Sequence, residues 1–563
     1  MTKADLVING AVLFDGAAVI EAADTIAIVD GRIAAIGVER EVRAQFPTAR
    51  ETVNAAGALV SPSFTDAHVH PVQGGMERMQ CDLTEAADAA ETLELIGRYA
   101  RANPELDWIL GSGWHMAHFA GGRPTADALE SVAPGRAVFL ANADHHGAWV
   151  SHEALRRMGI DANTADPADG VIDRAPDGAP SGTLQEGAMT LAERVLPSHS
   201  LDEYVAAIDT AQRYLASFGV TGWHDAIVGP YAGAIDSTAA YRAAVERDVL
   251  RLHVTGALWL GRELNFETID DTVAGLLDRR RQFELGPLRA TAIKVMQDGV
   301  VETETAALKS PYSSRDEHQH GQKNCNHRGQ SHFDPGLLSA IVPKLALAGF
   351  QLHFHAIGDR ALAECLDAVA AARAAGDDGR ARHHVAHLQV VDPVDIRRMA
   401  ELGVSANLQM LWACDDEQAV TLSKPALGPD RYAAQYPFAS MEAASIPLAA
   451  GSDWPVSTPD PWQAISVAVT RTEPGAGDGG ADKRIAESFA PAERLSLVSA
   501  LGAYTRGSAE LVGMPHGSGR IAVGSPADLA LHDRNPFALP ASELHRMRVH
   551  TTLLGGAVLH EAG

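Results

Sequence analysis

The chain has 563 residues, of which 46% are hydrophobic and 21% charged, a composition typical of a soluble globular protein with more than one structural unit. Its formal net charge of −26 argues against partners such as nucleic acid or anionic membranes, because both need a basic surface. The four widely spaced cysteines are typical of neither a disulfide framework nor a thiolate zinc site, and no segment is typical of a signal peptide or membrane helix. We therefore expect a cytoplasmic protein of enzyme size.

Both ends of the chain carry short β-like runs. Residues 5–20 predict two short strands, and residues 25–37 predict a hairpin around the Asp30-Gly31 turn. Residues 527–532 and 549–559 have the same pattern near the other end. Neither end has enough strands to close a core, so we predict that residues 1–58 and 511–563 form the two halves of one small β-sandwich domain.

Between the two ends, apolar runs alternate with helical patterns, which is typical of parallel α/β architecture. Predicted helices such as 203–217, 361–372 and 394–402 separate the runs. Eight βα units over this length predict a (β/α)8 barrel of the TIM type over residues 59–510, with functional side chains at the C-terminal ends of its strands. The eight runs begin at residues 59, 220, 252, 290, 350, 383, 404 and 446.

Two stretches interrupt the alternation. Residues 71–200 are too many for one βα loop and are rich in Gly, Pro, Asp and Trp, so we predict an inserted subdomain after the first barrel strand. Residues 310–333 are polar, and we expect a solvated loop near the barrel mouth. Metal binding by its four histidines is the alternative; these are His318, His320, His327 and His332.

The first barrel strand ends in two histidines, His68 and His70. Residues two apart on a strand point to the same side, so both imidazoles can converge on one metal ion. Four further polar residues stand at or near the ends of later predicted strands, and all six side chains would point into one barrel mouth. The four are Lys294, His355, His387 and Asp453.

Imidazoles and a carboxylate without thiolates favour zinc, with manganese, cobalt, nickel or iron as alternatives, and the number of ions is one or two. Lys294 needs a separate explanation, because an ammonium has no lone pair for a cation. It either stays charged beside an acidic neighbour or is carbamylated, which would make it an anionic ligand able to bridge two ions.

The chain resembles the amidohydrolase superfamily, and within it the YtcJ-like (amidohydrolase 3) group, over its whole length. The motifs that carry the resemblance include Asp66-Ala-His-Val-His70, Gly113-Trp114, His146-Gly-Ala-Trp-Val150, Ile293-Lys294, His355-Ala-Ile-Gly-Asp-Arg360 and Gly451-Ser-Asp-Trp-Pro-Val456. The resemblance implies a metal-dependent barrel hydrolase that acts mostly on C–N bonds. By position it makes His68, His70, His355 and His387 metal ligands, Lys294 a further ligand and Asp453 the catalytic carboxylate.

We therefore predict a hydrolase that cleaves a non-peptide C–N bond in a linear amide, an N-substituted formamide or a urea-like small molecule. Metal-activated hydroxide would attack the carbonyl carbon, with Asp453 as metal ligand and as general base and then acid. His146 is a candidate for polarising the carbonyl or binding substrate, and a purely structural histidine is the alternative. Trp114 and Trp454 are the expected substrate-binding aromatic residues.

Other functions stay open on the same scaffold, because a fold does not fix a substrate. A cyclic amidase or a deaminase is one alternative. An aminoacylase or dipeptidase is another, and it would need a cation such as Arg360 or Arg506 for the substrate carboxylate. A non-catalytic binding protein is disfavoured by the complete set of ligands. For the assembly, a homodimer is the expectation.

Overall fold

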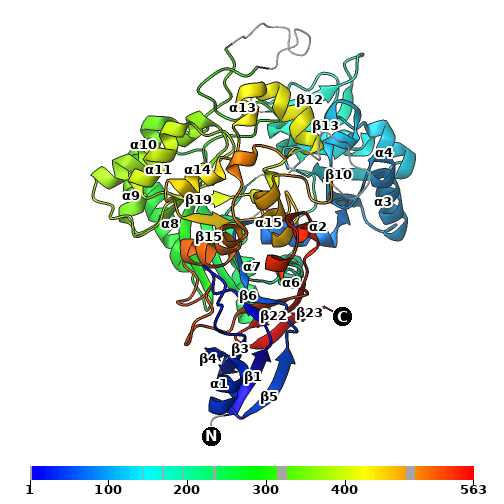
Figure 1. The fold of residues 1–563 in the computed structure, drawn as a ribbon. Helices are drawn as coiled ribbons and strands as arrows, with labels where there is room; N and C mark the ends of the chain where they lie inside the picture. The colour runs from blue at the N-terminus through cyan, green and yellow to red at the C-terminus, as the bar shows by residue number, and fades with distance from the viewer. Residues whose placement is uncertain are drawn as a thin grey trace.

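The computed structural model describes residues 3–143, 145–167, 170–192, 194–231, 236–313, 326–476 and 488–562. Figure 1 shows a central barrel-like sheet, a lower unit in which blue and red strands from the two ends of the chain lie together, and a cyan unit at one side. No helix within the described ranges is long and apolar enough to cross a membrane. Residues 314–325 of the histidine-rich stretch, including His318 and His320, lie outside the described residues.

A parallel eight-stranded sheet forms the centre of the molecule, and its strands follow one another in chain order from β7 to β20. The sheet curls until its edges approach: the Asp453 N–H donates to the His68 carbonyl at 2.8 Å. At this seam a Cβ on Gly451 would lie 2.5 Å from the His68 backbone nitrogen, so only glycine fits. The result is a nearly closed barrel. Its strands are β7 (Phe64–Val69), β14 (Val220–Val228), β15 (His253–Trp259), β16 (Leu288–Met296), β17 (Gln351–Ala356), β18 (His384–His387), β19 (Ser405–Leu408) and β20 (Leu448–Ala450).

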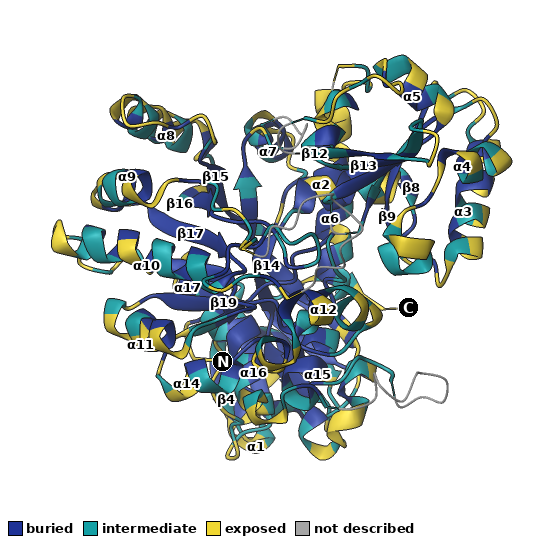
Figure 2. Cartoon of the chain, turned by 90° about the horizontal axis from the view of Figure 1, so that it is seen from above, coloured by how far each residue is buried: buried dark blue, intermediate teal, exposed yellow. Residues whose placement is uncertain are grey.

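Helices surround this sheet, and Figure 2 shows the buried strands in dark blue inside a ring of helices whose outer faces are exposed. The three helices predicted over 203–217, 361–372 and 394–402 are confirmed as parts of α6, α10 and α11. A capping box between Ser200 and Glu203 fixes the start of α6, which satisfies backbone N–H groups at that end. The outer helices are α6 (Leu201–Ser217), α7 (Thr238–Glu246), α8 (Ile269–Phe283), α9 (Pro335–Leu347), α10 (Asp359–Ala374), α11 (Pro393–Leu402), α14 (Phe438–Ala443) and α15 (Pro461–Thr470).

All eight predicted barrel strands are present, but the first is shorter than predicted. The apolar run from Leu59 divides into β6 (Leu59–Pro62) and β7. β6 pairs instead with β21 (Leu529–His532) near the other end of the chain. The proline at the end of β6 has no N–H to continue a ladder, so the chain changes sheets there.

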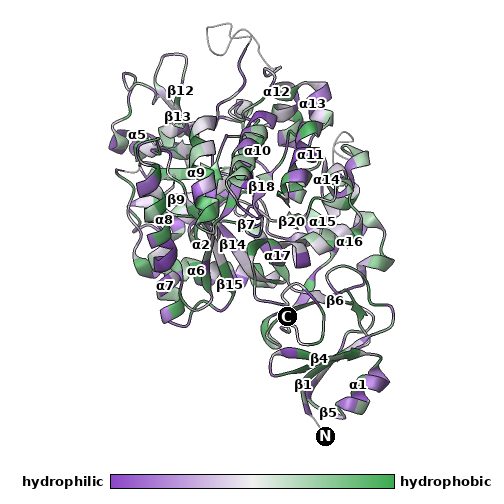
Figure 3. Cartoon of the chain, turned by 90° about the vertical axis from the view of Figure 1, so that its left-hand side faces the viewer, coloured by the Kyte–Doolittle hydropathy of each residue, from purple (hydrophilic) through white to green (hydrophobic). Residues whose placement is uncertain are grey.

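Two sheets form the lower unit and share one hydrophobic core, which includes Ile8, Ile26, Val60, Leu529 and Leu553. In Figure 3 its strand β4 is mostly green, whereas α1 (Glu39–Gln45) on its surface is largely purple. The predicted hairpin is confirmed, with positive φ at both turn residues. One sheet contains β4 (Arg32–Gly37), β3 (Thr25–Val29), β1 (Lys3–Asn9) and β5 (Thr48–Asn54); the other contains β2 (Val12–Leu13), β6, β21, β22 (Val549–Leu554) and β23 (Ala557–Glu561).

The segment after the first barrel strand begins with α2 (Pro71–Met79) and then builds a six-stranded sheet with its own core. Its helices are α3 (Ala89–Ala102), α4 (Ala126–Val132) and α5 (His152–Met158). Its strands, in sheet order, are β12 (Gly170–Arg174), β13 (Pro180–Glu186), β11 (Gly147–Val150), β10 (Ala137–Asn142), β9 (Trp108–Trp114) and β8 (Cys81–Asp82). The domain boundaries at residues 58, 71, 200 and 510 stay predictions.

Candidate metal and active site

The six polar residues predicted at strand ends lie close together at one end of the barrel. We call them the outer cluster: His68 in β7, His70 directly after it, Lys294 in β16, His355 in β17, His387 at the end of β18 and Asp453 after β20. Parallel strands bring their C-terminal ends to one rim, which is why residues separated by almost 400 positions meet.

The Asp453 carboxylate is the centre of the outer cluster. Its Oδ1 lies 3.1 Å from His70 Nε2 and 3.4 Å from His68 Nε2, and its Oδ2 lies 3.9 Å from His387 Nδ1. Burial alone would raise the pKa of Asp453, but the contact with His70 and the neighbouring positive charges hold that pKa below its usual range. The carboxylate therefore stays ionised and can accept protons or ligate a cation.

Lys294 lies beside this carboxylate, with its Nζ 3.4 Å from His68 Nε2. Burial lowers the pKa of Lys294 to about 8, although Asp453 and Asp225 act in the opposite direction. A substantial fraction of the amine is thus neutral near neutral pH, and the neutral amine is the form that reacts with CO2. The environment suits the predicted carbamate as well as a buried cation.

His355 and His387 complete the cluster, with ring centroids 4.3 Å apart. Burial lowers the pKa of both imidazoles, that of His387 to about 3, so both are neutral and offer lone pairs. The His387 side chain is almost fully buried, and its contact with the Gln409 side chain leaves at least one ring nitrogen without a hydrogen-bond partner among the described residues. One ligand atom each from His68, His387 and Asp453 lies within 4.8 Å of the other two, so this donor set could hold a divalent metal ion.

Strained backbone presents two of these side chains. His387 has φ of 78° and Asp453 has φ of 57°, which is the left-handed region that costs non-glycine residues about 1–3 kcal/mol. Hydrogen bonds hold both residues in place: the Gln409 side chain accepts from the His387 N–H at 2.7 Å, and the Asp453 N–H is fixed at the barrel seam. Such strain is more common at functional sites than in ordinary strand ends.

Asp66 stabilises the same seam through hydrogen bonds to both edge strands. Its carboxylate accepts hydrogen bonds from the backbone N–H groups of His68 and Ser452 and from the Ser452 hydroxyl. Burial raises its pKa to about 7, although those bonds act to lower it. Asp66 therefore ties the first and last barrel strands together next to their metal-ligand candidates.

A cavity of about 510 Å³ opens over the outer cluster. His355, His387 and Asp453 form its floor on the barrel side, and His146 reaches it from the inserted segment. Trp412 forms part of the wall and stacks on the His387 ring with centroids 5.2 Å apart and planes 2° apart. The candidate ligands are thus open to a small molecule.

His146 is paired with Glu186, a residue that sequence reasoning missed. The His146 Nδ1 lies 3.0 and 3.1 Å from the two Glu186 carboxylate oxygens, and the Glu186 N–H donates to the His146 carbonyl. Burial alone would raise the pKa of Glu186. The charge and hydrogen bond of His146 outweigh that effect, so the pKa lies below its usual value. The pair fixes the orientation of the imidazole; forty residues separate its members, so no local pattern could have indicated it.

The two tryptophans predicted to bind substrate lie elsewhere. Trp114 is packed in the core of the inserted sheet against Phe119 and Trp149, and its Nε1 donates to the Leu140 carbonyl. Trp454 is 4% exposed and packs on Tyr214. Neither is among the residues that line the cavity. The sequence around an aromatic residue does not show whether its ring faces a core or a cavity. Trp412 is the tryptophan that lines the cavity wall.

The other candidates for binding also lie outside the cavity wall. Arg360 donates to the carbonyls of Arg328 and Gly329, and Arg506 pairs with Glu510. Of the histidines in the predicted loop that the structure describes, His327 contacts the Glu304 carbonyl and His332 contacts the Met296 carbonyl.

Comparisons with known proteins agree with this architecture. The family model described as "Amidohydrolase family" matches residues 51–560. The protein named "Putative amidohydrolase YtcJ" of Bacillus subtilis (strain 168) is 28% identical over 96% of this chain and 96% of its own length. The N-substituted formamide deformylase of Arthrobacter pascens is 27% identical, over 96% of this chain and 95% of the relative.

Among solved structures, an uncharacterized metal-dependent hydrolase from Pyrococcus horikoshii OT3 shares the fold, with a TM-score of 0.70, 21% identity, and coverage of 95% of this chain and 99% of that one. The match of the family model over almost the whole chain and the polar residues at the C-terminal rim of the barrel lead to one conclusion. The chain belongs to the amidohydrolase family.

Proposed function

We propose that this protein hydrolyses a non-peptide C–N bond in a small neutral or cationic linear amide, N-substituted formamide or urea-like compound. One observation carries the proposal: an ionised carboxylate, Asp453, lies within 3.1–3.9 Å of three imidazoles on the floor of a cavity. The similarity to an N-substituted formamide deformylase supports the same bond type.

The donor set fits one or two divalent ions, with zinc as the expected metal because the ligands are imidazoles and carboxylates. When bound, such a metal lowers the pKa of a coordinated water and polarises a carbonyl oxygen. The residues that would hold it are those of the outer cluster: His68, His70, Lys294, His355, His387 and Asp453.

Asp453 is proposed to move the protons. Its lowered pKa keeps the carboxylate ionised and so available to accept the proton of the attacking water, and its place between His68 and His387 limits its movement. The same oxygen then gives that proton to the leaving amine as the C–N bond breaks. Because the amine leaves as a neutral molecule, an amide or formamide gives one carboxylic acid and one amine, and a urea gives one carbamic acid and one amine.

His146 is proposed to orient or polarise the substrate carbonyl from the opposite wall, with Glu186 holding its ring. Both residues come from the segment after the first barrel strand. In this proposal that segment is an inserted subdomain that supplies one side of the active site, while the two terminal sheets form a β-sandwich that takes no part in catalysis.

The cavity wall supports substrates without a carboxylate. Its described residues include no lysine or arginine, and four carboxylates lie around the cavity in addition to Asp453: Glu302, Asp416, Glu417 and Glu473. An aminoacylase would need a cation to pair with its substrate carboxylate, so this wall argues against that alternative. It suits an amine portion that is neutral or positively charged.

A substrate panel tests the proposal. N-substituted formamides, linear amides and ureas would be offered in matched sets whose amine portion carries a neutral, cationic or carboxylate substituent, and released acid and amine would be measured separately. We expect equal amounts of acid and amine, with carboxylate-bearing compounds the poorest substrates. Ammonia release without a new acid would indicate a deaminase, and preference for the carboxylate series would favour an aminoacylase.

A further inference from the structure

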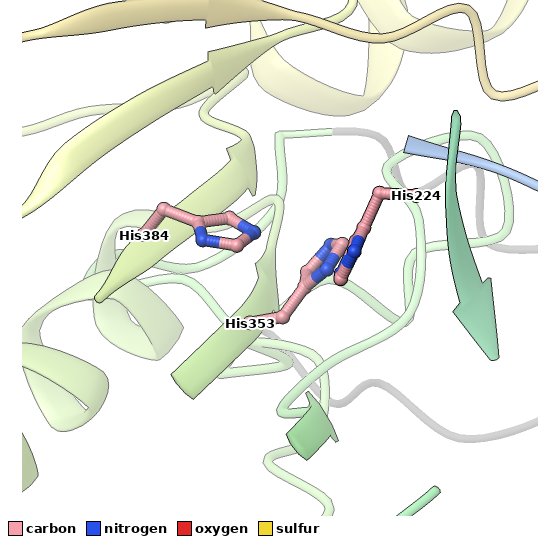
Figure 4. Close-up of side chains that lie close together, drawn as sticks. All are labelled: His224, His353 and His384. Carbon is pink, nitrogen blue, oxygen red and sulfur yellow. The ribbon is translucent and has the colours of Figure 1, made fainter. Parts of the chain in front are cut away.

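A second histidine cluster lies inside the barrel, and the proposed reaction does not use it. We call it the inner cluster: His224 from β14, His353 from β17 and His384 from β18. All three side chains are completely buried. Figure 4 shows them converging from three separate strands. His353 and His384 precede the outer-cluster residues of the same strands by two and three positions, so the inner cluster lies nearer the N-terminal ends of the strands.

The three rings are close enough to share one small ligand. One ring nitrogen of each lies within 4.8 Å of one from each of the others. The His353 ring stands 4.3 Å from that of His384 and 5.2 Å from that of His224, measured between centroids. Three nitrogen atoms bound to one zinc ion at about 2.0–2.1 Å lie about 3.3–3.6 Å apart. Binding therefore requires the three rings to move toward one another by up to about 1.5 Å.

Several of these nitrogens have no hydrogen-bond partner within the described part of the chain: Nε2 of His224, Nδ1 of His353 and at least one ring nitrogen of His384, whose ring also contacts the Arg382 backbone. A buried polar atom left without a partner costs about 1–3 kcal/mol. The remaining nitrogens are used, since His224 Nδ1 meets the Thr255 hydroxyl at 2.7 Å and His353 Nε2 meets His68 Nδ1 at 2.9 Å. By contrast, the adjacent His383 has both ring nitrogens hydrogen bonded, to the Leu352 N–H and to Asp377.

We propose that His224, His353 and His384 bind one divalent transition-metal ion in the barrel core, separate from the outer cluster. Three imidazoles without a carboxylate or thiolate suit zinc, cobalt, nickel or copper rather than magnesium or calcium. The site is not open to the cavity: none of the three residues lines it. Its role is therefore not to bind the organic substrate.

Metal counting tests the inner site without any substrate. The outer cluster would be disabled by His70→Ala, His355→Ala and His387→Ala together, and the chelated protein would be titrated with Co²⁺ and then with Zn²⁺. We expect one Co²⁺ per chain with a visible absorption band. Adding His384→Gln or, separately, His224→Gln should remove that ion, whereas the neighbouring His383→Gln should leave it. X-ray absorption of the zinc-loaded triple variant should show three imidazole nitrogens.

Two outcomes would overturn the proposal. One is a folded triple variant, by near-ultraviolet circular dichroism, that binds no cobalt or zinc. The other is binding that His384→Gln and His224→Gln leave unchanged, since the ion would then lie elsewhere. If the triple variant does not fold, the same question is answered in the otherwise native chain, where His384→Gln should lower the metal content by one ion per chain and an unchanged content contradicts the site.

Discussion

The outer and inner clusters both use histidines of β17 and β18, yet only the outer one is equipped for hydrolysis. β17 supplies His355 to the outer cluster and His353 to the inner one. The outer cluster contains the Asp453 carboxylate and opens to a cavity of about 510 Å³, whereas no residue of the inner cluster lines that cavity and the side chains that it contacts include Thr255 and His68. A group of histidines is thus a catalytic candidate only when an acid–base partner and access for substrate accompany it.

Backbone conformation separates the clusters as well. His387 and Asp453 of the outer cluster have positive φ, while His224, His353 and His384 lie in regular strand conformation. His387 and Asp453 stand at or after a strand end, where the backbone leaves the ladder, whereas His68, Lys294 and His355 of the outer cluster lie within strands as the inner residues do. The cost of the strained conformation falls where chemistry is proposed.

The largest expected effect follows from removing the proton carrier of the outer cluster. Asp453→Asn should lower turnover by roughly 10²–10⁴-fold, because the amide cannot accept and return the proton. The control is Asp528→Asn, a buried aspartate of the terminal sheets that accepts a hydrogen bond from the Gly555 N–H. Rates of amine release by the two variants would be compared, and equal rates would remove Asp453 from its proposed role.

Lys294 belongs to the outer cluster, and its burial should lower the free energy of unfolding. Its pKa falls from 10.5 to about 8 on folding, so the free energy of unfolding is reduced by about 3 kcal/mol below pH 8, and this penalty disappears as the pH rises from about 8 to 10.5. Metal-free Lys294→Met should therefore be more stable than metal-free wild type at pH 7, with a smaller difference at pH 10. Urea unfolding in CO2-free buffer measures this; a difference independent of pH would contradict it.

Glu186 supports the outer cluster from the inserted segment, and its effect should be smaller. Glu186→Gln keeps the size of the side chain but loses the charge that orients His146, so we expect turnover to fall about tenfold with little change in KM. Glu203→Gln at the start of α6 is a matched control. Should both variants behave alike, the His146–Glu186 pair would be structural only.

The smallest expected effect concerns the aromatic wall. Trp412→Leu removes the ring that stacks on His387, and aromatic pairs of this kind contribute about 0.5–1.5 kcal/mol beyond area burial. We expect KM to rise roughly two- to tenfold while metal content stays constant. Trp108→Phe, in the inserted sheet, provides the comparison; a lower metal content in Trp412→Leu alone would mean that the ring acts on the ligand instead.

Much of the fold could be predicted from the sequence, because barrel strands are buried on both faces and appear as apolar runs such as that of β7. The positions of His68, His355, His387 and Asp453 at the barrel rim were predicted from the ends of the same apolar runs. The transfer of β6 to the terminal sheet depended on pairing with a strand more than 450 residues away, which no local pattern encodes.

Long-range packing explains what sequence reasoning left undecided in the site. The His146–Glu186 pair forms only when β11 and β13 lie side by side, and Trp412 rather than Trp114 or Trp454 lines the wall because packing decides which face each ring occupies. The inner cluster did leave a signal, since His353 and His355 are spaced like His68 and His70. Without the barrel geometry, however, that spacing does not show that His353 belongs to a separate cluster deeper in the barrel.

The outer cluster is proposed to hydrolyse its substrate with a bound metal ion. The most direct measurement removes the metal with a chelator and returns it in steps, recording metal per chain by elemental analysis and amine release on the best substrate of the panel. We predict no turnover in metal-free protein and a rise in proportion to metal binding that His70→Ala with His387→Ala abolishes. Full turnover by metal-free protein would contradict a metal-dependent reaction at the outer cluster.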